Sequence, residues 1–144
     1  MELKLIGRKE KISLPELGLH LVSAKVDTGA YTSSIHAENI KLVEESGKIV
    51  LKFQPLLSGH KAFTGEVVTF ENYRKKKVKN SFGHAEIRYL IKTNFQLAGE
   101  EYIAEFSLSD RSSMRNAILL GRKILKKRFL VNVSKSNLGK SYLI

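Results

Sequence analysis

Short stretches rich in Val, Ile, Thr, Phe and Tyr recur along the chain between Gly, Asn and Ser residues, and this pattern predicts β-strands. The clearest pair is 85–97 and 101–108, because Ala98-Gly99-Glu100 is a short connection suited to a hairpin. Residues 122–128 are expected to be helical, since good helix formers follow a glycine there. The other predicted strands are 3–12, 20–26, 35–43, 48–53 and 66–73.

Two segments are expected to be loops. Residues 55–65 contain Gly59 and Gly65, and residues 74–83 are mostly polar. No internal repeat or linker interrupts the chain, and 144 residues suit one compact domain, residues 1–144. The predicted fold class is therefore all-β, with one short C-terminal helix.

The amino-acid composition excludes several classes of function. Without cysteine, disulfides, thiolate zinc sites and cysteine nucleophiles are excluded. No apolar stretch has the length of a signal peptide or a membrane span, so we expect no membrane contact and a cytoplasmic location. Lysine and arginine exceed aspartate and glutamate by 25 to 14, which favours an anionic partner. The basic runs lack interleaved stacking aromatics, so they support nucleic-acid binding only weakly and fit a solvated surface better.

The segment Asp27-Thr28-Gly29-Ala30 follows the largely apolar residues 21–26 and precedes a hydroxyl-rich stretch, 31–34. In acid proteases, two such turns bring two carboxylates together, and the pair holds the water that attacks the peptide carbonyl. Glycine permits a tight turn, and the threonine hydroxyl can form hydrogen bonds between the loops. The same residues are also common in turns without chemistry, and that interpretation stays open.

A second segment adds to this interpretation. Residues 117–122, Ala-Ile-Leu-Leu-Gly-Arg, lie late in the chain and precede the predicted helix. They resemble the apolar-apolar-Gly segment that packs beneath the catalytic loop of retroviral-type aspartic proteases. The resemblance implies a retropepsin-like acid-protease barrel.

A narrower resemblance covers nearly the whole chain. It is carried, in order, by Ser13-Leu14-Pro15-Glu16-Leu17-Gly18, Ala24-Lys25-Val26-Asp27-Thr28-Gly29-Ala30, Thr32-Ser33, His36-Ala37, Ser81-Phe82-Gly83-His84-Ala85-Glu86-Ile87-Arg88, Leu119-Leu120-Gly121-Arg122-Lys123-Ile124-Leu125 and Arg128-Phe129-Leu130-Val131. These segments resemble the RimB-like family of bacterial and archaeal proteins named ATP-dependent zinc proteases. Members are often found beside RimK-type glutamate ligases and are assigned a retropepsin-like fold.

The resemblance implies that Asp27 is the catalytic or binding carboxylate and that Thr28 and Gly29 shape its loop. Because the chain has one Asp-Thr-Gly, the simplest source of a second carboxylate is a homodimer that pairs Asp27 with its copy. Asp110 is the alternative within one chain, although its segment lacks a glycine that would let the backbone approach closely.

The family name invokes zinc, and His36, His84 and Glu86 are the candidate ligands. The sequence has no His-Glu-x-x-His and no cysteine ligand, so zinc rests on the name alone and no cofactor is expected. A polar row or a Glu86–Arg88 ion pair is the favoured alternative, because residues two apart share one face of a strand. The chain also lacks a phosphate-binding loop for ATP.

The substrate is inferred from charge and from the neighbouring ligases. A basic peptidase associated with glutamate ligases is expected to bind acidic or glutamate-rich peptides, with Lys25, Arg88 or Arg122 contacting carboxylates. The competing hypothesis is a non-catalytic module that binds RNA, the ribosome or an acidic protein through its basic surface. A metallopeptidase is the third possibility.

Overall fold

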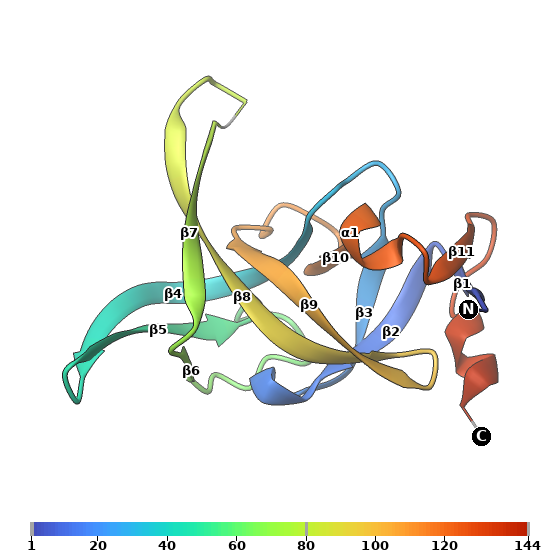
Figure 1. Ribbon diagram of the computed structural model, residues 1–144, viewed down its shortest axis with the longest axis horizontal. Helices are drawn as coiled ribbons and strands as arrows, with labels where there is room; N and C mark the ends of the chain where they lie inside the picture. Colours follow the sequence, from blue (N-terminus) through green and yellow to red (C-terminus); the bar gives the residue numbers. More distant parts are fainter. Residues whose placement is uncertain (1, 80, 144) are drawn as a thin grey trace.

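The computed structural model describes residues 2–79 and 81–143 and consists mostly of strands (Figure 1). In chain order the elements are β1 (Lys4–Gly7), β2 (Lys9–Leu14), the 3-10 helix η1 (Pro15–Leu17), β3 (Leu19–Val26), β4 (Ser33–Glu45), β5 (Lys48–Pro55), β6 (Val68–Phe70), β7 (Tyr73–Lys79), β8 (Ala85–Leu97), β9 (Glu100–Ser109), β10 (Ile118–Leu120), α1 (Arg122–Leu125), β11 (Phe129–Asn132) and the 3-10 helix η2 (Leu138–Tyr142). Within these described residues, no helix is long and apolar enough to cross a membrane.

Six strands close into a barrel. Their hydrogen-bonded order is β10–β3–β2–β8–β9–β4, and β4 pairs again with β10 to complete the ring. At this closure the short strand β10 runs parallel to β3 and antiparallel to β4. The closed barrel and the short helix α1 confirm the predicted retropepsin-like fold class.

The barrel core follows from alternation along the strands. In β8 the side chains of Ile91, Thr93, Phe95 and Leu97 are buried, while the residues between them are more exposed. In β9 the buried apolar side chains are Ala104, Phe106 and Leu108. A period of two places one set of side chains inside and the other outside, which is why these segments were recognisable in the sequence.

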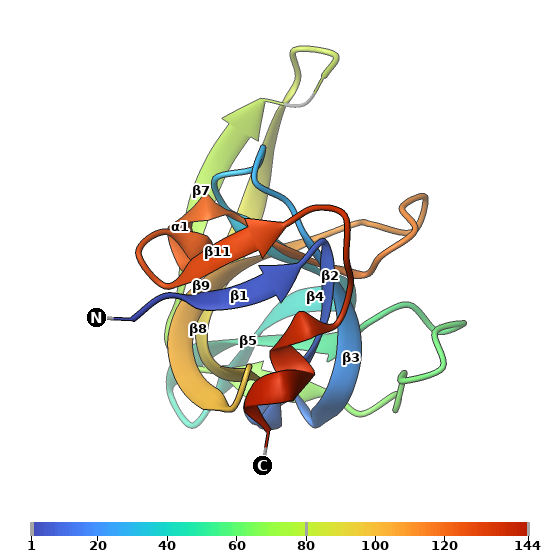
Figure 2. The same cartoon turned by 90° about the vertical axis from the view of Figure 1, so that its right-hand side faces the viewer.

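Hydrogen bonds to Glu10 hold the C-terminal segment against the barrel. Its side chain is buried, and its carboxylate accepts hydrogen bonds from the backbone N–H groups of Gly7, Leu138 and Gly139 at 2.7, 2.9 and 3.0 Å. Figure 2 shows η2 beside the parallel pair of β1 and β11 that these bonds help to hold. These three hydrogen bonds offset much of the cost of removing the carboxylate from water.

The β7–β8 hairpin corrects one prediction. Residues 74–83 were expected to form a loop, but Tyr73–Lys79 pairs in register with Ala85–Ile91. The hairpin projects from the barrel in both ribbon views (Figures 1 and 2). Most of the β7 side chains face solvent, so the strand shows no alternation of apolar and polar residues. Its strand identity comes from pairing with β8 rather than from burial.

The largest other differences from the predictions concern three elements. The predicted strand 3–12 is interrupted at Arg8 and resumes as β2, and the predicted strand 66–73 is reduced to the three residues of β6. The predicted helix 122–128 stops at Leu125, and Lys127 takes a positive φ of 65° that a continuing helix does not allow. Residues 57–67, between β5 and β6, are irregular, in agreement with the predicted loop at 55–65.

Candidate active site

The Asp27 loop begins where β3 ends, and its backbone is fixed by β10. The N–H of Asp27 donates to the carbonyl of Leu120 at 2.9 Å, and the N–H of Ala30 donates to the carbonyl of Asp27 at 3.2 Å. The parallel pairing of β10 with β3 places Leu120 beside Val26, one residue before Asp27. The position of Asp27 is therefore set by two segments from opposite ends of the sequence.

Gly121 allows the start of α1 to lie against the same loop. Its N–H donates to the buried Ser33 Oγ at 2.9 Å, while the next two N–H groups donate to Ala30 and Tyr31 carbonyls at 2.7 and 3.0 Å. A Cβ at Gly121 would lie 2.7 Å from the Tyr31 carbonyl oxygen, closer than real Cβ atoms approach. Only glycine permits this contact, so the Leu-Leu-Gly segment and the Asp-Thr-Gly loop form one interlocked unit.

The Asp27 carboxylate is partly exposed and has unused hydrogen-bond acceptor positions. Oδ1 accepts the Gly29 N–H at 2.9 Å, Oδ2 lies 3.7 Å from Lys25 Nζ, and the side chain is 27% exposed. A carboxylate can accept about four hydrogen bonds. Asp27 thus retains acceptor positions for a water, a substrate group or a second carboxyl group.

A cavity of about 270 Å³ adjoins this loop. Its lining carries the positive charges of Lys76, Arg88 and Arg111 and no carboxylate. The complete lining is Ala30, Thr32, Ser33, Ser34, Lys76, Val78, Arg88, Leu90, Ser107, Arg111 and Leu119. Lys76 and Arg88 are direct cross-strand partners in the β7–β8 hairpin, and the repulsion between these like charges is reduced by Glu86, whose carboxylate accepts hydrogen bonds from Arg88. We call this space the proximal cavity.

Arg111 is the residue of the proximal cavity that sequence reasoning missed. Its Nε donates to the Asn116 carbonyl at 3.0 Å and its Nη1 to Ser34 Oγ at 3.3 Å. The pKa of Arg111 is lowered, mainly by burial, and the negative charge of Asp27 opposes this shift. This guanidinium therefore sits within the electrostatic field of Asp27 and is held in a fixed orientation.

The predicted substrate-binding residues are distributed around the same region. Lys25 is the neighbour of the Asp27 carboxylate, and Arg122 Nη1 donates to the Thr28 carbonyl at 3.1 Å. Arg88 lines the proximal cavity, where its Nε and Nη2 donate to Glu86 Oε1 at 2.9 and 2.8 Å. The ion pair foreseen as the alternative to metal binding is thus present.

The predicted metal ligands are not brought together. His36 is buried in β4, and its Nδ1 accepts the backbone N–H of Arg111 at 2.8 Å. His84 instead precedes β8 in the turn of the hairpin, and Glu86 is bound to Arg88. Over residues 2–79 and 81–143, no three His, Cys, Asp or Glu side chains are grouped to hold a metal ion. The donor set does not fit zinc.

Two carboxylates, those of Glu38 and Asp110, lie near the His36 ring. Its Nε2 lies 3.6 Å from Glu38 Oε1, and its Nδ1 lies 3.8 Å from Asp110 Oδ1. Asp110 is also bound by the N–H and Oγ of Ser112, whose hydrogen bonds lower the pKa of Asp110. The contacts of Asp110 are therefore with His36 and Ser112, and those of the Asp27 carboxylate are with Gly29 and Lys25.

A closed barrel in which an Asp-Thr-Gly loop rests on a Leu-Leu-Gly strand is the architecture of a retropepsin-like chain. Residues 5–141 match the family described as "RimB-like: Retropepsin-like aspartic endopeptidase RimB". The chain belongs to this RimB-like family.

Several similar proteins have names that describe a ligase. A Desulfotalea psychrophila protein named "Probable alpha-L-glutamate ligase" is 36% identical over 152 residues, which cover 96% of this chain and 32% of the relative. A Shewanella pealeana protein of the same name is 35% identical over 137 residues, or 92% of this chain and 29% of the relative. The chain spans about a third of the length of these relatives.

A solved structure supports the fold along the whole chain. The crystal structure of a Legionella pneumophila protein of unknown function superimposes with a TM-score of 0.73 at 28% sequence identity. The match covers 96% of this chain and 100% of the Legionella chain. The barrel and its appended strands are therefore shared with a separate folded protein.

Proposed function

We propose that this chain is an aspartic endopeptidase that cleaves acidic, glutamate-rich peptides. The observation that carries the proposal is the open Asp27 carboxylate, which is held on an interlocked loop beside a cavity lined by cations and hydroxyl groups. A fixed loop supports catalysis because the reacting group needs no reorganisation when the substrate binds.

The chemistry requires a second carboxyl group. Two such groups share one proton, so that the ionised one takes a proton from the attacking water while the protonated one polarises the peptide carbonyl. Since the described contacts of Asp110 are not with the Asp27 loop, the proposal takes the partner from a second copy of the chain. A two-fold axis that passes near Asp27 makes the pair from two identical residues.

The cations supply the preference for acidic peptides. Arg88 and Arg111 lie in the proximal cavity, and a guanidinium binds a carboxylate with two parallel hydrogen bonds. Lys25 and Arg122 extend the positive charge around the loop itself. The glutamate-ligase names of the relatives support a substrate that contains glutamate.

Asp27→Asn tests the proposal. Cleavage of a peptide with a tail of glutamates, followed by mass spectrometry, is expected to fall by about 100-fold or more, since the general base is lost. Asp110→Asn is the matched control and is expected to keep most of the activity. Sedimentation of the wild type is expected to show a dimer at the concentrations that give cleavage. Equal rates for wild type and Asp27→Asn would refute the aspartic mechanism.

A non-catalytic binding module is the second candidate, supported by the formal charge of +11 and the cationic β7 strand. It predicts that the wild type cleaves no peptide and that Asp27→Asn leaves RNA or acidic-protein binding unchanged. The same assay, repeated with a chelator, tests the metallopeptidase hypothesis, which requires loss of activity when metal is removed.

A further inference from the structure

A second cationic cavity lies where β7, β8, β9 and α1 meet. It has a volume of about 340 Å³ and is lined by Arg74, Lys92, Ile103, Ala104, Glu105, Lys123, Ile124 and Arg128. Four of these side chains are positively charged and one is negatively charged. We call this space the distal cavity.

Glu105, the one acidic residue in this lining, is already bound by Arg74. Nε and Nη2 of Arg74 donate to the two oxygens of Glu105, both at 2.7 Å, and Lys123 Nζ lies 3.6 Å away. The hydrogen bonds from Arg74 lower the pKa of Glu105, so this carboxyl group stays ionised and neutralises one positive charge. The lining keeps an excess of positive charge that suits an anionic ligand.

Arg128 is held in a fixed orientation in this lining. Its Nη1 donates to the Ile124 carbonyl at 3.3 Å, and its guanidinium lies 5.6 Å from the centre of the Tyr102 ring. Lys92 is exposed on β8 and adds a second charge to the lining. A guanidinium fixed in this way loses little conformational entropy when it binds a carboxylate.

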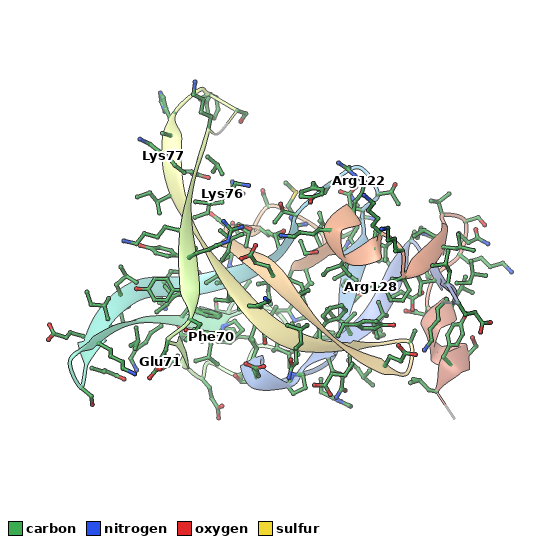
Figure 3. All side chains as sticks on the ribbon, viewed as in Figure 1. Phe70, Glu71, Lys76, Lys77, Arg122 and Arg128 are labelled. Atoms are coloured by element: carbon green, nitrogen blue, oxygen red, sulfur yellow. The ribbon has the colours of Figure 1, made fainter. Side chains whose placement is uncertain are left out.

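The two cavities are joined by two elements. Arg74 of the distal cavity and Lys76 of the proximal cavity are two residues apart on β7 and therefore share one face of the strand. The backbone N–H of Lys123, another distal residue, donates to the Tyr31 carbonyl in the Asp27 loop. Figure 3 shows Lys76 on the side of the hairpin toward Arg122 and Lys77 on the opposite side.

We propose that the distal cavity is a second carboxylate subsite, which binds one acidic side chain of a peptide while another occupies the proximal cavity. Two residues along a strand span about 6.6–6.8 Å, which is also the repeat of side chains on one face of an extended peptide. On β8, Lys92 of the distal cavity and Arg88 of the proximal cavity are four residues apart and share one face of the strand, which is two such repeats. An extended peptide with acidic residues four positions apart matches this offset. The proposal rests on the proposed function for the identification of the ligand as a peptide.

Binding measurements on the Asp27→Asn protein test this subsite without substrate turnover. Fluorescence anisotropy compares a labelled extended peptide that carries acids at positions i and i+4 with the same peptide carrying one acid. The two-acid peptide is expected to bind about 10-fold more tightly, the gain of one charge-assisted hydrogen-bonded contact. Adding Lys92→Gln with Arg128→Gln is expected to remove this gain and leave binding of the one-acid peptide nearly unchanged.

The matched control is Lys75→Gln with Lys77→Gln, which removes the same charge from the other face of β7. This control is expected to keep the tighter binding of the two-acid peptide. If the variant with both Lys92→Gln and Arg128→Gln does not fold, Lys92→Gln alone replaces it, because Lys92 is exposed. An equal loss in the control, or a gain that survives in the distal variant, overturns the proposal. So does a single-stranded DNA of similar charge that binds more tightly and loses affinity in the same variant. Absence of cleavage by the wild type would refute only the proposed function, because the binding difference is measured separately.

Discussion

Glu10 and Asp27 each use a carboxylate to organise nearby backbone, and the comparison separates structural from chemical roles. The Glu10 carboxylate is buried, and both of its oxygens accept backbone N–H groups. The Asp27 carboxylate accepts one backbone N–H and is 27% exposed. A buried carboxylate that accepts three backbone N–H groups holds the fold together, whereas a partly exposed one that accepts a single N–H has acceptor positions open to a water or a substrate. The number of occupied acceptors, more than the residue type, distinguishes the two regions.

The largest expected effect comes from Glu10→Gln. The amide NH₂ of glutamine replaces one carboxylate oxygen and cannot accept, so at least one buried backbone N–H loses its acceptor and the others lose a charged one. The change is expected to lower the free energy of unfolding by about 3 kcal/mol. Asp27→Asn, in contrast, is expected to change it by less than about 0.5 kcal/mol. Urea unfolding of both variants measures the difference. Similar losses in the two proteins would remove the distinction between the carboxylates.

Gly121→Ala tests the interlocked Asp27 loop. The new Cβ would press on the Tyr31 carbonyl, and overpacking of this kind costs about 2 kcal/mol. Peptide cleavage is expected to fall as well, because the loop that carries Asp27 must shift. Gly59→Ala, where nothing lies within 4 Å of an added Cβ, is the control and should leave both stability and cleavage nearly unchanged.

His36→Leu tests whether this histidine positions Arg111. The change removes the acceptor of the Arg111 N–H and is expected to cost about 1.5 kcal/mol and to weaken binding of acidic peptides. His36→Asn, whose amide oxygen can take the place of Nδ1, is expected to restore part of both losses. Addition of zinc should leave the melting temperature of the wild type unchanged. A rise in melting temperature with zinc that is lost in His36→Leu would reassign His36 to a metal site.

The smallest effect is expected for the Arg74–Glu105 pair that anchors the exposed hairpin. Because Arg74 lowers the pKa of Glu105 in the folded state, the pair contributes stability above the unfolded pKa and loses it as the pH falls through the lower, folded pKa. A double-mutant cycle with Arg74→Gln and Glu105→Gln should give a favourable coupling at pH 7 that shrinks below about pH 4. A coupling that does not depend on pH would mean that charge is not its source.

The parts of the fold with two-residue alternation were predictable from the sequence. The hairpin of β8 and β9 was predicted almost to its ends, and its turn is made by Ala98 and Gly99, both with positive φ. The β7 strand was missed because most of its side chains face solvent and leave no alternating pattern. Strand identity in such a ribbon depends on its partner, which a local pattern does not contain.

The candidate site likewise contains one residue that the sequence pointed to and one that it did not. Asp27 could be proposed as the site carboxylate because the whole Asp-Thr-Gly loop lies within a few consecutive residues. Arg111 was missed because it reaches the site through the parallel pairing of β9 with β4, which places Ser109 opposite His36 and carries the following loop toward Ser34. No local signal marks that arginine, because its position depends on two strands that are distant in sequence.

The parallel contact between β3 and β10 has a consequence for how the chain folds. Ala24, near the start of the sequence, pairs with Ile118, near its end, and β1 likewise pairs with β11. Contacts between such distant segments slow folding, since a long stretch of chain must be ordered before they form. During synthesis the barrel therefore stays open, with one edge of β3 unpaired, until β10 has been made. Completion of the Asp27 loop, which depends on backbone hydrogen bonds to Leu120 and Arg122, is then a late event in folding.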